Sequence, residues 1–448
     1  MQLTLTFVVV LQEFRYVFSQ PSFQTFCALM TGWCLSPRRR FVTELILSSG
    51  SARDGHHSCY HRFFSQASWD LDFLWRILAR VLLNTFAPTG LVELAGDDTL
   101  CRKRGLTIYG TGMHHDPLIS SRALKLVSWG HDWVVLCLVV RCFWAPSKVW
   151  CLPLCCRLYR NRQGLTKGRK GKKRPPDPNH RTRPELFREM LGLLAAWFPQ
   201  RQFVVSGDSA YGGQSVLRHL PANVDLISHV HPKGGLYAPA PPPSGKGRPR
   251  TKGARLAPMA QWAADASQPW TELCFDQFGL HATLAVKTRQ ALYYKAGKDR
   301  LLTIVLVHDL AGQRPEQMFY STRLDWDARR ILASYAARWA IEVTFENCKQ
   351  LLGLEDPANR TALAVQRTAP MALVLYSAIV IWFHRLGHRC LAYPDRPWYP
   401  HKEEPSFADM LTTLRRISWE EHLRQLLAGS GLLRNSLSQL IDFASRAG

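Results

Sequence analysis

The sequence predicts a protein of the α/β class in which helices flank a mixed sheet. Two observations support this class. Residues 1–88 carry apolar residues at helical spacing, most clearly at 69–83. From residue 89 onward, short runs rich in Val, Leu, Trp and Cys alternate with turn residues and with two further amphipathic helices. Strand runs separated by amphipathic helices predict a sheet that is covered by helices.

The order of the predicted elements is strand, strand, strand, helix, strand, followed by more strands and a long helix. Helices are predicted at residues 69–83, 184–197 and 326–352, and Pro184 suits the first turn of the second one. Strands are predicted at residues 90–98, 131–140, 148–158, 203–206, 224–230 and, in short pieces, across 271–310, including 301–307. The Pro/Gly/Lys/Arg-rich stretch 239–252 is typical of an exposed linker.

Composition points to a globular protein with a polyanionic partner. Of the 448 residues, 46% are hydrophobic and 20% are charged, which excludes disordered and fibrous classes. Lys and Arg outnumber Asp and Glu by 57 to 34, so the formal net charge is +23, and nucleic acid is the usual partner of such a chain. The loop 161–183 is especially basic, and we expect its Lys170, Lys172 and Lys173 to contact nucleic-acid phosphates, a solvated tail being the alternative.

The sequence favours a reduced, cytoplasmic compartment. The apolar run 7–11 lacks the basic flank and cleavage site of a signal peptide. The apolar stretch 369–383 is shorter than the ~18 residues that span a bilayer, so it predicts a buried helix and no membrane partner. The twelve cysteines form no CxxC pairs, and Cys151, Cys155 and Cys156 lie among apolar residues, where thiols act as small hydrophobes.

Two histidine-containing clusters resemble metal-ligand sets but are interpreted as loops. The first comprises His56, His57, Cys59 and His61, and no second ligand pair at zinc spacing follows it. The second comprises His114, His115 and Asp116, which we expect in a polar loop after the first strand.

The helix at 326–352 has one polar and one apolar face. At 100° per residue, its polar face groups side chains within about 60° of one another, namely Tyr335, Arg338, Glu342 and Lys349. The opposite flank carries Ala337, Ile341, Phe345, Cys348 and Leu352. An ordinary amphipathic helix with an Arg338–Glu342 ion pair is the alternative interpretation.

Two aspartates lie at predicted strand ends. Asp98 occurs in the string GDDTL and Asp208 in the string GDSAYG, where turn or cap aspartates are the alternative. With Glu342 they form a set of three acids from distant segments. Carboxylates of this kind can bridge two Mg²⁺ ions, for which Mn²⁺ can substitute, and so promote phosphoryl transfer.

The spacing Tyr335-x2-Arg338-x3-Glu342-x6-Lys349 resembles the tyrosine–arginine–glutamate–lysine signature of a major group of bacterial insertion-sequence transposases. These are DDE-superfamily enzymes with a ribonuclease-H-like catalytic core. DDTL at 97–100 and GDSAYG at 207–212 resemble the first and second acidic motifs of the group. The resemblance covers residues 90–355.

The resemblance implies a role for each matching residue. Asp98, Asp208 and Glu342 would be the catalytic, metal-binding triad, while Tyr335, Arg338 and Lys349 would grip DNA phosphates beside the cleavage site. Asp97 is an alternative to Asp98, although an acid followed directly by Thr fits the motif better. Glu346 lies about 40° from Glu342 on the same helix face but breaks the spacing.

The resemblance also implies an organisation and a function. A ribonuclease-H-like core would be interrupted by a β-rich insertion in which Trp262 or Trp270 would stack on an extruded base, ordinary core tryptophans being the alternative. The expected regions are a helical DNA-binding region at 1–88, core segments at 89–231 and 319–390, the insertion at 232–318 and a helical region at 391–448.

The implied protein is a transposase that cleaves and joins DNA. It would act as a homodimer on terminal inverted repeats and target DNA in the bacterial nucleoid. An inactive, transposase-derived DNA-binding protein and a nuclease of the same fold are the alternatives.

Overall fold

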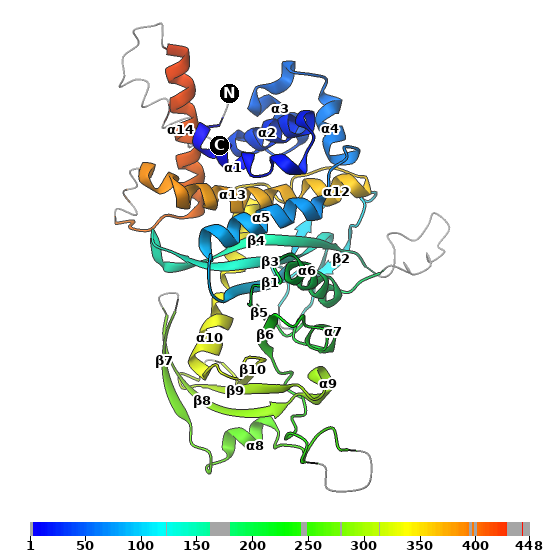
Figure 1. The fold of residues 1–448 in the computed structure, drawn as a ribbon, viewed down its shortest axis with the longest axis vertical. Coiled ribbons are helices and arrows are strands. Elements are labelled where there is room, and N and C mark those ends of the chain that lie inside the picture. Colours follow the sequence, from blue (N-terminus) through cyan, green and yellow to red (C-terminus); the bar gives the residue numbers. More distant parts are fainter. Residues whose placement is uncertain are drawn as a thin grey trace, which may run out of the picture.

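A long mixed sheet runs from the middle of the molecule to one end, and a helical layer covers the other end (Figure 1). The computed structural model describes residues 3–121, 123–161, 180–242, 249–277, 280–312, 314–393, 397, 401–427 and 441. In these residues, ten strands form one sheet in the order β2-β3-β1-β5-β6-β10-β9-β8-β7, and β4 pairs with β3. The strands are β1 (Val92–Arg102), β2 (Gly112–His115), β3 (Val127–Cys142), β4 (Ala145–Tyr159), β5 (Phe203–Gly207), β6 (Val224–His229), β7 (Thr271–Gln277), β8 (Leu280–Leu292), β9 (Leu301–Asp309) and β10 (Gln317–Ser321).

The strand directions divide the sheet into two parts. β1, β3 and β4 form an antiparallel meander, whereas β5 and β6 continue from β1 in parallel. β10 then pairs antiparallel with β6 and connects the sheet to β9, β8 and β7. The strands of the expected β-rich insertion therefore extend the central sheet.

The helices lie before, between and after the strands. They are α1 (Leu5–Gln12), α2 (Gln20–Leu35), α3 (Val42–Ser49), α4 (His57–Ser65), α5 (Leu71–Phe86), α6 (Arg183–Trp197), α7 (Gln214–Leu217), α8 (Met259–Ala264), α9 (Tyr294–Gly297), α10 (Ala328–Ala337), α11 (Ala340–Gln350), α12 (Ala362–Thr368), α13 (Pro370–Arg385) and α14 (Phe407–Leu427). Local sequence sets several starts. Thr182 and Glu185 form a capping box at α6, and Asp70 caps α5 by accepting the amide hydrogen of Phe73.

The helices from the two ends of the sequence form one layer (Figure 1). The Thr4 amide donates to Ser418 Oγ at 3.0 Å, and the Trp33 indole donates to the Leu352 carbonyl at 2.7 Å. α13 lies at the centre of this layer, almost entirely buried, as expected for residues 369–383. The helical stretch Ala362–Arg385 is long and apolar enough to cross a membrane, but 94% of its apolar 18-residue window is buried inside the protein. It is the core helix of this layer.

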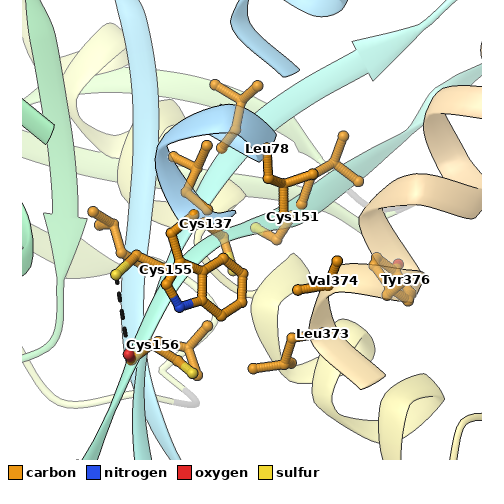
Figure 2. Packing of buried hydrophobic residues seen from close by; sticks show 14 of the residues in the cluster. Leu78, Cys137, Cys151, Cys155, Cys156, Leu373, Val374 and Tyr376 are labelled. Carbon is orange, nitrogen blue, oxygen red and sulfur yellow. Dashed lines mark hydrogen bonds between the residues drawn. The ribbon is translucent and has the colours of Figure 1, made fainter. Parts of the chain in front are cut away.

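Cysteines fill the space between the sheet and this layer. Figure 2 shows Cys137, Cys151 and Cys155 packed with Leu78 of α5 and Leu373 of α13. All twelve cysteines are free thiols, and burial raises the pKa of Cys155 to about 11. The prediction that Cys151, Cys155 and Cys156 act as small hydrophobes agrees with this packing.

Three details differ from the sequence predictions. β1 continues to Arg102, so Asp97 and Asp98 lie within a strand and not at its end. The predicted long helix is divided at Arg338 and Trp339 into α10 and α11. Successive i→i−3 hydrogen bonds, including Ile341 N–H to Arg338 O at 2.9 Å, tighten the backbone there. β2 was not predicted, because GMHH lacks the apolar alternation of a typical strand.

Candidate active site

Asp97 lies in β1, and Asp208 directly follows β5, the strand that pairs in parallel with β1. Ala95 of β1 pairs with Ser206 of β5, and Gly96 pairs with Gly207. One residue further along each strand are Asp97 and Asp208. Because paired residues point to the same face of a sheet, these two carboxylates belong to one face. Ser206 identifies that face, since its hydroxyl donates to the Ser334 carbonyl of α10 at 3.2 Å.

Asp98 points to the opposite face of β1. A Cβ atom added to Gly96 would lie 2.0 Å from Phe187 Cε2, so the face of Gly96 packs closely against α6. Successive side chains of a strand alternate between faces, which places Asp98 on the α6 face and Asp97 on the α10–α11 face. Of the three acids predicted for the triad, Asp208 and Glu342 therefore share a face with Asp97 and not with Asp98.

Arg338 connects the turn between α10 and α11 to β1. Its Nη1 donates to Asp97 Oδ2 in an ion pair, and the two side chains are only 11% and 18% exposed. Burial raises the pKa of Asp97 to about 7, while the Arg338 guanidinium lowers it and the Asp98 and Asp208 charges raise it. Arg338 Nε is buried and has no hydrogen-bond partner among the described residues. The Arg338 guanidinium is thus a mostly buried cation that lies between Asp97 and Tyr335.

The alternative Arg338–Glu342 ion pair is absent from the ion pairs of the described residues, in which Arg338 pairs with Asp97. Glu342 lies on the exposed side of α11. Burial of its carboxyl group raises its pKa, and the nearby Arg338 guanidinium lowers it. The other side of α11 is fixed to the core, where Thr344 Oγ1 donates to the Cys151 carbonyl of β4 at 2.7 Å.

The loop that carries Asp208 is held at both ends. The Ser228 hydroxyl donates to the Asp208 carbonyl at 2.7 Å, and the Tyr320 hydroxyl donates to the Gly212 carbonyl at 2.7 Å. A Cβ atom at Gly212 would lie 2.3 Å from Ser228 Oγ, so only glycine fits this close approach. The Asp208 side chain accepts the Ala210 amide hydrogen at 2.9 Å and remains half-buried.

Tyr335, near the end of α10, and Lys349, near the end of α11, lie on the side of the sheet that these helices cover. Tyr335 packs against His229 and Phe319, with ring centroids 4.8 and 4.9 Å apart, and burial raises its pKa. Lys349 is half-buried. Burial raises the pKa of the Cys101 thiol of β1, and the charge of Lys349 lowers it. Glu346, the alternative acid, is exposed and accepts a hydrogen bond from Gln350 at 3.0 Å. Lys170, Lys172 and Lys173 lie outside the described residues.

The α6 face of β1 carries a polar network that the sequence analysis did not identify. Asp98 Oδ1 accepts a hydrogen bond from the Tyr211 hydroxyl at 2.7 Å, and Asp98 Oδ2 lies 3.4 Å from Arg183 Nε. Arg183 also binds Asp132 of β3, whose pKa burial raises to about 7. A signal was present, since Asp132 interrupts an apolar strand run, and a buried carboxylate requires a partner.

The two histidine clusters are not loops. His57, Cys59 and His61 lie on α4, with His56 as its N-cap. His114 and His115 belong to β2, and the buried Asp116 accepts a hydrogen bond from Arg102 Nε at 2.7 Å. The apolar contacts of α4 and the pairing of β2 with β3 explain these differences.

The two candidate stacking tryptophans are already in contact with cations. Trp262 is 1% exposed, its indole N–H donates to Gln268 at 2.9 Å, and the Arg289 guanidinium lies 3.7 Å from its ring centroid. Trp270 is partly buried, and Lys287 Nζ lies 4.7 Å from its ring centroid. Trp262 is therefore a core tryptophan that is not accessible to a base.

The acids of the α10–α11 face suit a hard divalent cation by their chemistry. Asp97, Asp208 and Glu342 supply carboxylate oxygens, the ligands that Mg²⁺ prefers. Burial is the main cause of the raised pKa of Asp97, and the Arg338 guanidinium opposes it. Within the described residues, no group of three or more His, Cys, Asp or Glu side chains is arranged to hold a metal ion. The three carboxylates therefore match Mg²⁺ in the type of ligand atom, but they do not form a coordination shell in this structure.

A family model described as DDE superfamily endonuclease matches residues 14–296, which is more than half of the chain. The chain therefore belongs to the DDE superfamily of endonucleases. The match includes Asp97, Asp98 and Asp208 and ends before Glu342. The mixed sheet with flanking helices is consistent with this family. A search among curated proteins finds no match.

Proposed function

We propose that this chain is a DDE transposase that cleaves DNA at transposon ends and joins them to target DNA. One relationship supports the proposal most strongly. Asp97 and Asp208 lie side by side on the sheet face that carries Arg338 and Glu342 on the covering helices. Carboxylates from strand β1, from the loop after β5 and from helix α11 thus lie near the Arg338 guanidinium, although they are far apart in the sequence.

The first carboxylate of the proposed triad is Asp97 and not Asp98. The motif comparison favoured Asp98 because it directly precedes Thr99. Asp98 lies on the α6 face of β1, where its carboxylate contacts Tyr211 and Arg183. Asp97 faces the helices that carry Arg338 and Glu342. The proposed catalytic, metal-binding residues are therefore Asp97, Asp208 and Glu342.

Asp97, Asp208 and Glu342 would hold two Mg²⁺ ions, or Mn²⁺ ions, which when bound would favour attack on a phosphodiester and departure of its leaving oxygen. Arg338, whose side chain is 11% exposed beside Asp97, would bind a phosphate oxygen beside the scissile bond. Tyr335 and Lys349 would contact phosphates on the same side. Arg338 would also compensate the Asp97 charge in the absence of DNA.

The sheet topology supports a ribonuclease-H-like core. An antiparallel meander of β1, β3 and β4 is extended by the parallel strands β5 and β6. Asp97 lies in β1, and Asp208 directly follows β5. The strands β7 to β9 continue beyond this core. Residues 1–88 would help to bind DNA, and the +23 charge supports a polyanionic partner. The proposed complex is a homodimer on two inverted repeats, within the bacterial nucleoid.

The proposal is tested with supercoiled plasmid and with labelled transposon-end duplexes. The natural duplexes come from sequencing the DNA that flanks the coding region, where short inverted repeats are expected. Wild-type protein with Mg²⁺ should nick the end and transfer it to target DNA, and EDTA should stop both reactions. Asp97→Asn, Asp208→Asn and Glu342→Gln should each abolish nicking while DNA binding persists.

Other outcomes identify the alternative functions. DNA binding without any metal-dependent nicking would indicate an inactive, transposase-derived binding protein. Nicking without strand transfer would indicate a nuclease of the same fold. Full nicking by any one of the three variants would remove that residue from the triad.

A further inference from the structure

We propose that the adjacent residues Asp97 and Asp98 have separate tasks, and that Asp98 is a positioning residue that acts through Tyr211 to fix the loop carrying Asp208. This inference rests on the proposed metal-binding role of Asp97 and Asp208. It assigns to Asp98, Tyr211 and Arg183 a role on the face of β1 opposite to the proposed active site.

Asp98 is held by two protein partners. Its Oδ1 accepts the Tyr211 hydroxyl hydrogen at 2.7 Å, and its Oδ2 lies 3.4 Å from Arg183 Nε at the first turn of α6. Asp97, by comparison, faces Arg338 from the other side of the same strand. Both Asp97 oxygens are engaged as well, since Oδ1 accepts the Asp98 amide hydrogen at 2.9 Å and Oδ2 pairs with Arg338. The face of the strand distinguishes the two aspartates, because Asp98 lies on the α6 face with Tyr211, opposite to Arg338. Asp98 therefore suits a positioning role.

Tyr211 is the link between Asp98 and Asp208. Its backbone N–H donates to the Asp208 carbonyl at 3.1 Å, which closes the turn after β5. Its side chain is fully buried and lies against Phe187, with ring centroids 4.7 Å apart. A Cβ atom at Gly207 would lie only 3.0 Å from Tyr211 Cβ, so the glycine admits the ring at this position. The Tyr211 ring thus extends from the Asp208 loop to the α6 face, where its hydroxyl group donates a hydrogen bond to Asp98.

The consequence is a connection between the two faces of the sheet. Asp98 sets the position of Tyr211, and Tyr211 sets the turn that orients Asp208 beside Asp97. Residues that orient a metal ligand from outside the coordination shell change metal affinity by about 10- to 100-fold when they are removed. A ligand itself must be negatively charged, whereas an acceptor for a tyrosine hydroxyl need only supply an oxygen atom.

This difference gives the test. Mn²⁺ binding to the full chain is measured by calorimetry for wild type, Asp97→Asn, Asp98→Asn, Asp98→Ala, Tyr211→Phe and the double variant Asp98→Ala/Tyr211→Phe. Asp97→Asn should abolish binding. Asp98→Asn, which keeps an oxygen acceptor for Tyr211, should keep most of the affinity. Asp98→Ala and Tyr211→Phe should each weaken binding by about 10- to 100-fold, and the double variant should be no weaker than either one.

The inference is overturned if Asp98→Asn loses Mn²⁺ binding as completely as Asp97→Asn, if the losses of Asp98→Ala and Tyr211→Phe multiply in the double variant, or if wild type binds no Mn²⁺. Thermal unfolding of each variant shows whether it is folded, and Tyr211→Phe, which keeps the ring, provides a second route if Asp98→Ala is unstable. Plasmid nicking at saturating Mn²⁺ is measured in parallel. The expected Mn²⁺ pattern without nicking by wild type would refute the proposed transposase and leave the positioning role intact.

Discussion

Arg338 donates a hydrogen bond to Asp97, although 241 residues separate them in the sequence. An uninterrupted helix would favour a pair between Arg338 and Glu342, one turn away. The tight turn between α10 and α11, the packing of α11 on β1 and the packing of α10 on β5 and β6 direct Arg338 to the sheet instead. Arg338 therefore has a structural role toward Asp97 in addition to its proposed role toward phosphate.

Substitutions of Arg338 should separate these two roles. Arg338→Ala leaves the Asp97 carboxylate without its cation, and we expect a loss of stability on the order of 3 kcal/mol together with a loss of end cleavage on the order of 100-fold. Arg338→Lys should recover much of the stability, because an ammonium still compensates Asp97. It should not recover cleavage, because lysine cannot form the bidentate fork. Melting temperature and cleavage rate are measured on the same preparations. Parallel recovery of both would show that Arg338 has only the structural role.

Glu342 and Glu346 provide a matched pair on one helix. Both are exposed on α11, but the charge of Glu342 acts on Arg338, whereas Glu346 accepts a hydrogen bond from Gln350. Glu342→Gln should abolish metal-dependent nicking, and Glu346→Gln should leave it nearly unchanged, with equal melting temperatures. Nicking assays with Mg²⁺ decide between them. If Glu346→Gln loses nicking and Glu342→Gln retains it, the third carboxylate of the proposed triad is Glu346 and not Glu342.

DNA affinity should fall steeply as salt rises, because the chain carries a net charge of +23 and binding to phosphates releases counterions. Replacing Lys170, Lys172 and Lys173 together with Gln should flatten the slope of log affinity against log salt by up to about three units. Fluorescence anisotropy at several salt concentrations measures the slope. If the slope is the same in wild type and the triple variant, these lysines do not contact phosphates.

Asp116 should make stability depend on acid pH. Its hydrogen bond with Arg102 lowers its pKa to about 2, below the ordinary value of 3.8. A carboxyl with a lowered pKa in the folded state stabilises that state above pH ~4 and loses this contribution as the pH falls toward 2. Asp116→Asn should therefore lower the melting temperature at pH 7 and reduce its dependence on pH between 4 and 2. A melting curve with the same acid dependence in the variant would contradict this role.

The sequence by itself determined those helices and strands that have a strong local apolar pattern. The periodicity of α5, α6 and α13 and the apolar runs of β3, β4 and β5 depend only on residues within each element. The same is true of the acidic strings at 97–98 and 208 and of the spacing from Tyr335 to Lys349. Through their resemblance to insertion-sequence transposases, these local features indicated the DDE superfamily and a short set of candidate residues.

Only the tertiary structure decided which face of β1 belongs to the proposed site. Two neighbouring aspartates necessarily point to opposite faces of a strand, and the sequence does not say which face a later helix will cover. Phe187 packed against Gly96 places α6 on one face, and Arg338 bonded to Asp97 marks the other. The partner of Arg338, the burial of Trp262 and the role proposed for Tyr211 likewise depend on contacts between distant segments. Such contacts are set by packing in three dimensions, which no local pattern encodes.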